Sequence, residues 1–298
     1  MSGELAATVV LPTTGDRGPL LFYSVGSILA QTVRNIEVFI MGDGVTSATR
    51  TAIADLMRCD PRISFFDHPK HVRRGEPHRH AALAGARGKI VCYLTDRDLM
   101  LPNHIEEMSR LLANADFGHT LRVAITTGSD FNFDFDRLDI NDPRDRSVAV
   151  ATPPPIPLAF AGHTLSMYRR LPFGWRTTPT DQPFTDLYMW QQFLSQPECR
   201  TATSTRPTIL FFKRGHHPGL PVEQRRAELM RWHANLENPD WLAKFPELVW
   251  EAAIRDRARI ARPEIPGLHA VLAARFPGMA AAIRRFPGLI AVLKRRLR

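Results

Sequence analysis

Residues 90–112, IVCYLTDRDLMLPNHIEEMSRLL, carry the clearest indication of fold class. The apolar run Ile90–Leu94 has the length and composition of a buried strand. A helix is expected over Pro102–Leu112, because proline suits the first turn of a helix. Two carboxylates, Asp96 and Asp98, lie between the strand and the helix. Ligands bind beyond the carboxyl ends of strands in open α/β sheets, so this stretch predicts both a sheet and a site at its edge.

The same alternation of apolar runs and amphipathic segments extends in both directions along the chain. Strands are expected at Thr8–Leu11, where Pro12 stops the run, and at Glu37–Met41, Ile63–Phe66 and Arg122–Thr126. Helices are expected at Leu20–Gln31, Ser47–Arg58 and His78–Ala86. A turn is expected at Gly42–Gly44. The alternation predicts a mainly parallel sheet covered by helices on both faces.

This alternation ends after the strand expected at Arg122–Thr126. The aspartate-rich segment Asp130–Arg146 and the proline cluster Thr152–Pro157 predict a long connection or lid. A second unit is expected beyond them, with a helix at Thr185–Leu194 and a strand at Thr208–Phe212.

Length and composition limit the class of protein. With 298 residues, 44% hydrophobic and 23% charged, the chain has the composition of a globular protein and not of a disordered one. No run approaches the roughly 18 apolar residues of a membrane span, and no basic segment precedes the first apolar run. The three cysteines lie far apart, which argues against a disulfide framework or a CxxC metal site. A cytoplasmic protein is therefore expected.

Basic residues gather at the end of the chain. Residues 265–298 contain seven basic and no acidic side chains, leaving only +2 of the net charge of +9 for the rest. A basic surface for nucleic acid is therefore not expected on the folded body. Two interpretations of the tail stay open. It could lie at an anionic membrane surface, or it could pack on the body as a helical segment with its charges in water.

Sequence motifs exclude some activities and favour others. Neither GxGxxG nor GxxxxGK[ST] occurs, which argues against dinucleotide-dependent hydride transfer and P-loop phosphoryl transfer. Asp96 and Asp98, one residue apart, could present oxygen ligands to a divalent cation while a diphosphate completes its coordination shell. The alternative is two surface aspartates that precede a helix, where negative charge favours the helix dipole.

Three segments of the chain resemble glycosyltransferases of family 2, which have the GT-A fold. They are PTTGDRG (Pro12–Gly18), SVGSILAQTVRNIEVFIMGDG (Ser24–Gly44) and HRHAALAGARGKIVCYLTDRDLMLPNHIEEM (His78–Met108). Within the family the spore-coat polysaccharide type is the most similar. The resemblance is close over Thr8–Leu112 and fainter to about Leu220.

The resemblance implies an α/β fold with a Rossmann-like, mainly parallel sheet flanked by helices. It further implies three parts. They are a nucleotide-sugar-binding subdomain at residues 1–112, an acceptor-binding and catalytic subdomain at 113–240, and a helical basic tail at 241–298.

The resemblance also implies which residues bind the donor. Pro12 and Thr13 would line the nucleotide pocket, and Asp43 would hydrogen-bond the base, uracil or thymine. Asp96 would lie near the ribose or the sugar. Arg79 would neutralise the diphosphate through a bidentate contact.

A metal ion, Mn²⁺ or Mg²⁺, is the cofactor that the resemblance implies. Asp98 would lie near this metal and the diphosphate, and His216 is a further candidate ligand. The chain departs from the family pattern in two places. Gly42 stands where many members have an aspartate, and Arg97 lies inside the acidic motif. Arg97 could reach a phosphate and replace part of the metal charge, or it could pair with Asp96 or Asp98 at the surface.

The acceptor half contains the candidate catalytic base. Asp186 matches the family's acidic residue at a helix start, which takes the proton from the attacking hydroxyl in an inverting transfer. From the residues alone, a helix N-cap is the alternative role for Asp186. Asp181, five residues earlier, is the alternative base if the alignment slips.

The residues and the resemblance together predict an inverting bacterial glycosyltransferase that uses a UDP- or dTDP-linked sugar and a saccharide or glycolipid acceptor. Peripheral contact with the inner face of the membrane depends on the interpretation of the basic tail. One rival is a nucleotidyltransferase, which would release pyrophosphate instead of a nucleoside diphosphate. The other is a non-catalytic relative acting as a scaffold at the membrane surface, suggested by Gly42, Arg97 and the tail.

Overall fold

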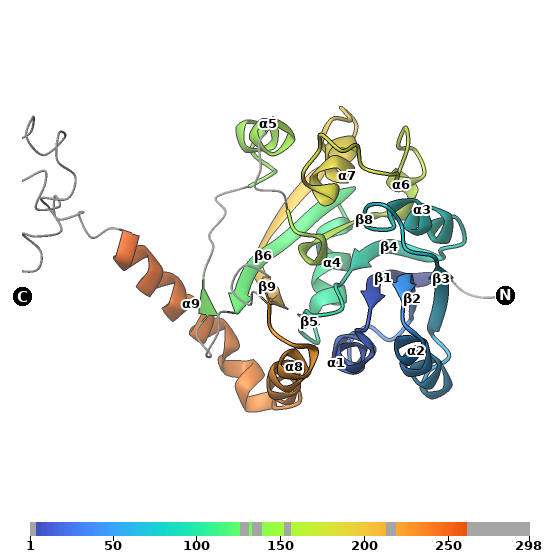
Figure 1. The fold of residues 1–298 in the computed structure, drawn as a ribbon. Helices are drawn as coiled ribbons and strands as arrows, with labels where there is room; N and C mark the ends of the chain where they lie inside the picture. The colour runs from blue at the N-terminus through green and yellow to red at the C-terminus, as the bar shows by residue number, and fades with distance from the viewer. Residues whose placement is uncertain (1–3, 126–130, 133–138, 152–155, 213–218, 261–298) are drawn as a thin grey trace, which may run out of the picture. The chain divides into compact units, whose positions relative to one another are not determined.

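The computed structural model describes residues 4–125, 131–132, 139–151, 156–212 and 219–260. Met1–Ala253 form one compact unit, and a second unit begins at Ile254. The first unit contains a sheet with helices against its faces (Figure 1). The division at residues 112 and 240 that the sequence suggested stays a prediction.

One sheet organises the first unit. Among the described residues, nine strands belong to it, in the order β3-β2-β1-β4-β8-β6-β9-β5, with β7 paired to β6. The strands are β1 (Leu5–Gly15), β2 (Ile36–Val45), β3 (Ile63–His68), β4 (Gly88–Tyr93), β5 (Leu99–Met100), β6 (Phe117–Ile125), β7 (Phe131–Asn132), β8 (Ala161–Thr164) and β9 (Thr201–Phe211).

Parallel pairing is confined to part of this sheet. The neighbours β3, β2, β1 and β4 are parallel, and so are β6 and β9. In contrast, β8 is antiparallel to both β4 and β6, and β5 and β7 also join antiparallel. Antiparallel neighbours need no helical crossover, so the regular strand-helix alternation is lost where they begin. The expected α/β sheet with flanking helices is confirmed, and its second half is mixed.

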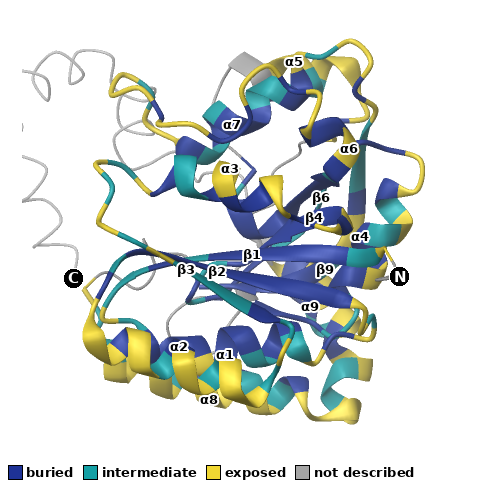
Figure 2. Cartoon of the chain, turned by 90° about the vertical axis from the view of Figure 1, so that its right-hand side faces the viewer, coloured by how far each residue is buried: buried dark blue, intermediate teal, exposed yellow. Residues whose placement is uncertain are grey.

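Helices cover both faces of the sheet (Figure 2). They are α1 (Gly18–Leu29), α2 (Ser47–Cys59), α3 (Glu76–Ala84), α4 (His104–Leu112), α5 (Pro143–Ala151), α6 (Leu165–Tyr168), α7 (Thr185–Leu194), α8 (Val222–Leu236) and α9 (Pro239–Ile260), with the 3₁₀ turn η1 (Leu158–Phe160). Figure 2 shows α1, α2 and α8 on one face and α3, α6 and α7 on the other.

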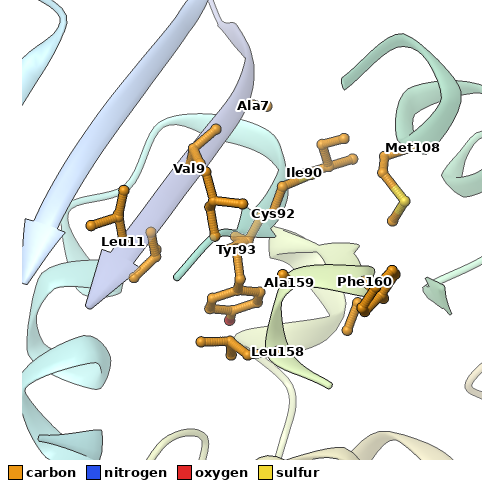
Figure 3. Packing of buried hydrophobic residues seen from close by; sticks show 14 of the residues in the cluster. Ala7, Val9, Leu11, Ile90, Cys92, Tyr93, Met108, Leu158, Ala159 and Phe160 are labelled. Atoms are coloured by element: carbon orange, nitrogen blue, oxygen red, sulfur yellow. The ribbon is translucent and has the colours of Figure 1, made fainter. Parts of the chain in front are cut away.

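The core lies along the central strands. Val9 and Leu11 of β1 and Val38 and Ile40 of β2 are fully buried, as expected for parallel strands covered on both faces. Figure 3 shows the ring of Tyr93, at the end of β4, lying close to Leu158 of η1. The acceptor half therefore packs on the same core as the first four strands.

Two sequence expectations at the ends of the first strands were wrong. Pro12 does not stop β1, which continues to Gly15. The pairing of β1 with β4 ends at Val10, before Pro12. Proline has no N–H to donate, and at this position β4 no longer requires one. The expected turn at Gly42–Gly44 belongs to β2, where Gly42 pairs with Thr13. A Cβ at Gly42 would lie 2.8 Å from the Phe65 ring, so close packing explains this glycine.

The second half also differs from expectation. The helix α5 begins at Pro143, inside the segment expected to be a long connection, and β9 begins at Thr201, well before the expected Thr208. Most of the proline cluster lies outside the described residues. In the part of the chain that the structure describes, no helix is long and apolar enough to cross a membrane. The basic tail at 265–298 also lies outside the described residues.

Candidate functional site

A cleft of about 350 Å³ opens at the carboxyl ends of β1 and β2, beside the segment that follows β4. Seven of the residues chosen from sequence line it: Pro12, Thr13, Asp43, Arg79, Asp96, Arg97 and Asp186. The other lining residues are Thr14, Arg17, Lys70, Arg73, Arg74, Thr95, Pro157, Leu158 and Phe211. Carboxyl ends of parallel strands meet at one sheet edge, which brings these distant segments together.

Asp96 lines this cleft and is only 3% exposed. The hydroxyl of Thr13 donates a 3.0 Å hydrogen bond to one carboxylate oxygen, and Nη1 of Arg17 donates a 2.9 Å bond to the other. These contacts join the end of β1 to the segment after β4. They hold the Asp96 carboxylate in one orientation and partly neutralise its charge.

Asp43 forms a second acidic position, at the end of β2. Its carboxylate accepts hydrogen bonds from the backbone N–H of His71 and from Nζ of Lys70. Gly75, in the left-handed region at φ 68°, comes directly before α3 and lies against Asp43. A Cβ there would meet the Asp43 side chain at 3.3 Å, so this glycine lets the start of α3 approach β2.

Arg79 extends from α3 into the cleft and is 3% exposed. Its Nη2 donates a 2.7 Å hydrogen bond to the carbonyl of Arg74, while Nε and Nη1 are buried without a partner. The guanidinium lies 4.6 Å from the centroid of the Trp175 ring. Burial lowers the pKa of Arg79, and the nearby carboxylate of Asp186 opposes this effect. A buried cation with two free N–H groups is suited to bind an anion.

Asp186 lies in the first turn of α7, on the acceptor side of the cleft. Its carboxylate accepts a 3.2 Å hydrogen bond from the backbone N–H of Leu158 and a 3.1 Å bond from the hydroxyl of Thr185. The N-cap of α7 is Phe184, which makes no side-chain cap bond, so the capping role considered for Asp186 is wrong. Asp181 is exposed and does not line the cleft.

Asp98 differs from Asp96 because its side chain is fully buried and does not line the cleft. It accepts a 3.0 Å hydrogen bond from the backbone N–H of Phe212 and another from the hydroxyl of Thr95. Burial raises the pKa of Asp98, and the charge of Arg97 opposes this rise. The structure thus brings Arg97 to the cleft and leaves Asp98 in a supporting position beneath it.

The described residues do not fit a bound divalent metal ion. Such an ion takes several oxygen ligands, yet the Asp98 side chain is fully buried and does not line the cleft. Asp96 does line the cleft, but its charge is already paired with that of Arg17. In the described ranges, no three His, Cys, Asp or Glu side chains gather to hold a metal ion. His216, the other candidate ligand, lies outside the described residues.

Several residues of the cleft were missed from sequence. Arg17 belongs to the PTTGDRG segment but follows its obvious polar residues. Lys70, Arg73 and Arg74 follow β3, so extending the search beyond the end of that strand would have found them. Leu158 had no signal, because its backbone N–H, and not its side chain, contacts Asp186.

Comparison with known proteins places this arrangement in a family. Residues 8–174, more than half of the chain, match the model of "Glycosyl transferase family 2". The chain is 25% identical over 112 residues to the GalNAc(5)-diNAcBac-PP-undecaprenol beta-1,3-glucosyltransferase of Campylobacter jejuni. That alignment covers 38% of this chain and 36% of the relative, so the match spans about a third of the relative's length.

Solved structures share the fold at low sequence identity. The mannosyltransferase PcManGT of Pyrobaculum calidifontis, solved with GDP-Man and Mn²⁺, has a TM-score of 0.52 and 18% identity, covering 94% of this chain and 81% of that one. TarS 1–349 of S. aureus in complex with UDP-GlcNAc has a TM-score of 0.53 and 13% identity, covering 78% and 66%. At these identities the comparison supports the GT-A fold alone.

Proposed function

The chain belongs to glycosyltransferase family 2, and we propose that it transfers a sugar from a nucleoside-diphosphate sugar to an acceptor hydroxyl with inversion at the anomeric carbon. One observation carries this proposal. The Asp43 and Asp96 carboxylates at the strand ends share a cleft with Asp186, which comes from the second half of the chain. Donor and acceptor sides are therefore parts of one site.

The donor half is suited to a nucleotide with an imide base. Each oxygen of Asp43 accepts one hydrogen bond from the protein and retains a free lone pair. That carboxylate could accept the N3–H of uracil or thymine, which supports UDP- or dTDP-linked donors. Thr13 and Pro12 form the adjacent wall, and Asp96 faces the region of the ribose or sugar. Arg79 supplies N–H donors for the diphosphate.

The acceptor half supplies the base. In the proposed step, the acceptor hydroxyl attacks the anomeric carbon, the bond from that carbon to the diphosphate oxygen breaks, and Asp186 takes the hydroxyl proton. A single displacement on the face opposite the leaving group inverts the configuration. The Leu158 N–H and the Thr185 hydroxyl orient the Asp186 carboxylate and leave lone pairs for the acceptor.

We propose a saccharide or glycolipid as the acceptor class. The support is that the Campylobacter jejuni relative is named for an undecaprenol-linked glycan. The spore-coat polysaccharide type, a cytoplasmic location and membrane contact through the tail stay predictions. The two rival functions, nucleotidyl transfer and a non-catalytic scaffold, differ from sugar transfer in what the protein releases.

Donor turnover tests the proposal. The protein would be incubated with UDP-glucose, UDP-GlcNAc or dTDP-glucose and water or simple saccharides as acceptors, and the products followed by phosphorus and proton NMR. Release of UDP or dTDP with a sugar of inverted anomeric configuration is expected. In a parallel incubation with UTP or dTTP and a sugar 1-phosphate, release of pyrophosphate would instead favour the nucleotidyltransferase. A sugar with retained configuration would contradict the single displacement.

A further inference from the structure

The cleft is richer in cations than its proposed donor contacts require. Six basic side chains line it, against three carboxylates: Arg17, Lys70, Arg73, Arg74, Arg79 and Arg97 against Asp43, Asp96 and Asp186. Two of the cations are already paired, Lys70 with Asp43 and Arg17 with Asp96. The remaining four arginines form no ion pair with any described residue. The residues that line the cleft therefore carry an excess of positive charge.

Two of these arginines have buried N–H groups without partners. Arg79 leaves Nε and Nη1 unbonded, and Arg97 leaves Nε unbonded. Buried polar groups in proteins almost always have a hydrogen-bond partner, and an unsatisfied charged donor is especially unfavourable. Both side chains line the same cleft, so one anionic ligand could satisfy them together. A diphosphate has enough acceptor oxygens to bind both guanidinium groups.

Arg97 lines the cleft, whereas its neighbour Asp98, the metal ligand expected from sequence, does not. Arg97 lies between Asp96 and Asp98 in the sequence. The Asp98 carboxylate instead accepts bonds from Thr95 and Phe212. The acidic motif thus offers one guanidinium and one already paired carboxylate to the ligand. This is the charge arrangement of an anion site and not of a metal site.

We infer that Arg97 and Arg79, and not a divalent metal ion, neutralise the donor diphosphate, so that this chain binds its nucleotide without metal. The inference rests on the proposed function, because it names how that same site holds the leaving group. Guanidinium groups are always charged at neutral pH and can bind phosphate oxygens in a bidentate manner. Their charge would stabilise the departing nucleoside diphosphate, as a metal ion does in other transferases.

Calorimetric titration of the wild-type protein with UDP gives the direct test, which depends on no variant. One titration contains EDTA and the other contains Mn²⁺ in excess of protein. We expect the two dissociation constants to agree within about twofold. Binding that appears only with Mn²⁺ would overturn the inference and leave the proposed function intact. Failure of UDP, dTDP and GDP to bind under either condition would overturn the proposed function and the inference with it.

A substitution at Arg97 tests which side chain provides the charge. Arg97→Gln should weaken UDP binding in EDTA by about tenfold to a hundredfold, the loss of a charged hydrogen bond. The matched control is Arg226→Gln on α8, which removes the same charge from a surface pair with Glu223 outside the cleft. The control should bind UDP as the wild type does. Unchanged affinity in a folded Arg97→Gln protein would remove Arg97 from the site.

Reversing the charge at the same position gives a second readout. Arg97→Asp places another carboxylate beside Asp96 in the cleft. We expect this variant to lose UDP binding in EDTA and to recover part of it when Mn²⁺ is added, because two carboxylates can share a cation. Binding in EDTA as tight as that of the wild type would contradict the inference. The melting temperature of each variant, measured without ligand, shows whether it is folded.

Discussion

The backbone N–H of Phe212 donates a 3.0 Å hydrogen bond to the carboxylate of Asp98, a residue 114 positions earlier in the chain. This bond joins the end of β9 to the segment that follows β4, at a point where Asp98 is fully buried. The acidic motif therefore has two functions. Asp96 and Arg97 line the cleft, while Asp98 supports the segment that carries them.

Replacing Asp98 should affect stability more than binding. Asp98→Ala removes the buried carboxylate that accepts hydrogen bonds from the N–H of Phe212 and the hydroxyl of Thr95, and we expect a loss of about 1–3 kcal/mol in the free energy of unfolding. Asp98→Asn retains an acceptor oxygen and avoids burying a charge, so it should be much less destabilised. Urea denaturation measures both. A folded Asp98→Ala protein of unchanged stability, with its nucleotide binding lost, would indicate a ligand role.

Asp186→Asn should slow sugar transfer strongly while nucleotide binding is retained. General-base catalysis by a positioned carboxylate contributes about 10²–10⁴ in rate, and we expect kcat to fall by that factor. UDP affinity, measured by calorimetry, should stay within about twofold. The matched control is Asp181→Asn, since Asp181 is exposed and outside the cleft. If the Asp181 variant lost sugar transfer while the Asp186 variant kept it, Asp181 would be assigned as the catalytic base in place of Asp186.

Asp43→Asn should weaken binding of uracil and thymine nucleotides. The amide replaces the charged acceptor that we propose for the base and also weakens the contact with Lys70, so a loss of roughly tenfold in UDP affinity is expected. Asp67→Asn is the control, because Asp67 lies at the end of the neighbouring strand β3 and pairs with Arg50 at the surface. Equal losses in both variants would argue against base recognition by Asp43.

Two buried histidines predict how stability depends on pH. Burial lowers the pKa of His163 to about 4 and that of His104 to about 3. In the unfolded chain the histidine pKa is about 6.5, so on acidification the unfolded state binds protons before the folded state does. The free energy of unfolding should therefore fall as the pH drops from about 6.5 towards 3–4. The free energy of unfolding, measured by urea titration across this range, follows the effect.

Variants assign this pH dependence to the buried histidines. His163→Gln removes one titrating group. For each pH unit of acidification in this window, the free energy of unfolding of the variant should therefore fall by about 1.4 kcal/mol less than that of the wild type. A wild-type slope in the His163 variant would assign the acid sensitivity to other groups. The comparison uses slopes, so a loss of stability from the substitution itself does not affect it.

Local patterns were sufficient to predict the first half of the fold. The runs at 37–41 and 63–66 are apolar and flanked by polar or glycine residues, and both lie within strands, β2 and β3. The periodic segment 47–58 agrees with α2, whose N-cap Thr46 bonds the N–H of Thr49. Asp43 was located from the run at 37–41 and Asp96 from the run at 90–94, because parallel strands end at the same sheet edge.

The second half could not be predicted in the same way. The strands β5, β7 and β8 are only two to four residues long, too short for an apolar period to identify. Their pairing depends on partners far away in the chain, as Ile90 of β4 pairs with Thr164 of β8. The capping role considered for Asp186 was wrong for a similar reason, since its carboxylate contacts Leu158, 28 residues before it.

The sequence alone determined the order of strands and helices along the first half of the chain and the acidic residues at the sheet edge. Both depend on hydrophobic periodicity and on the residues at the ends of each element, which lie close together in the sequence. Tertiary packing decided which residues of Thr95–Asp98 line the cleft: the first three do, while Asp98 is buried and accepts a bond from the N–H of Phe212. Adjacent residues in such a segment can point to opposite sides, and the choice depends on which distant donors are within reach. Which charged groups line the cleft, a guanidinium or a second carboxylate, was therefore decided by the fold and not by the local sequence.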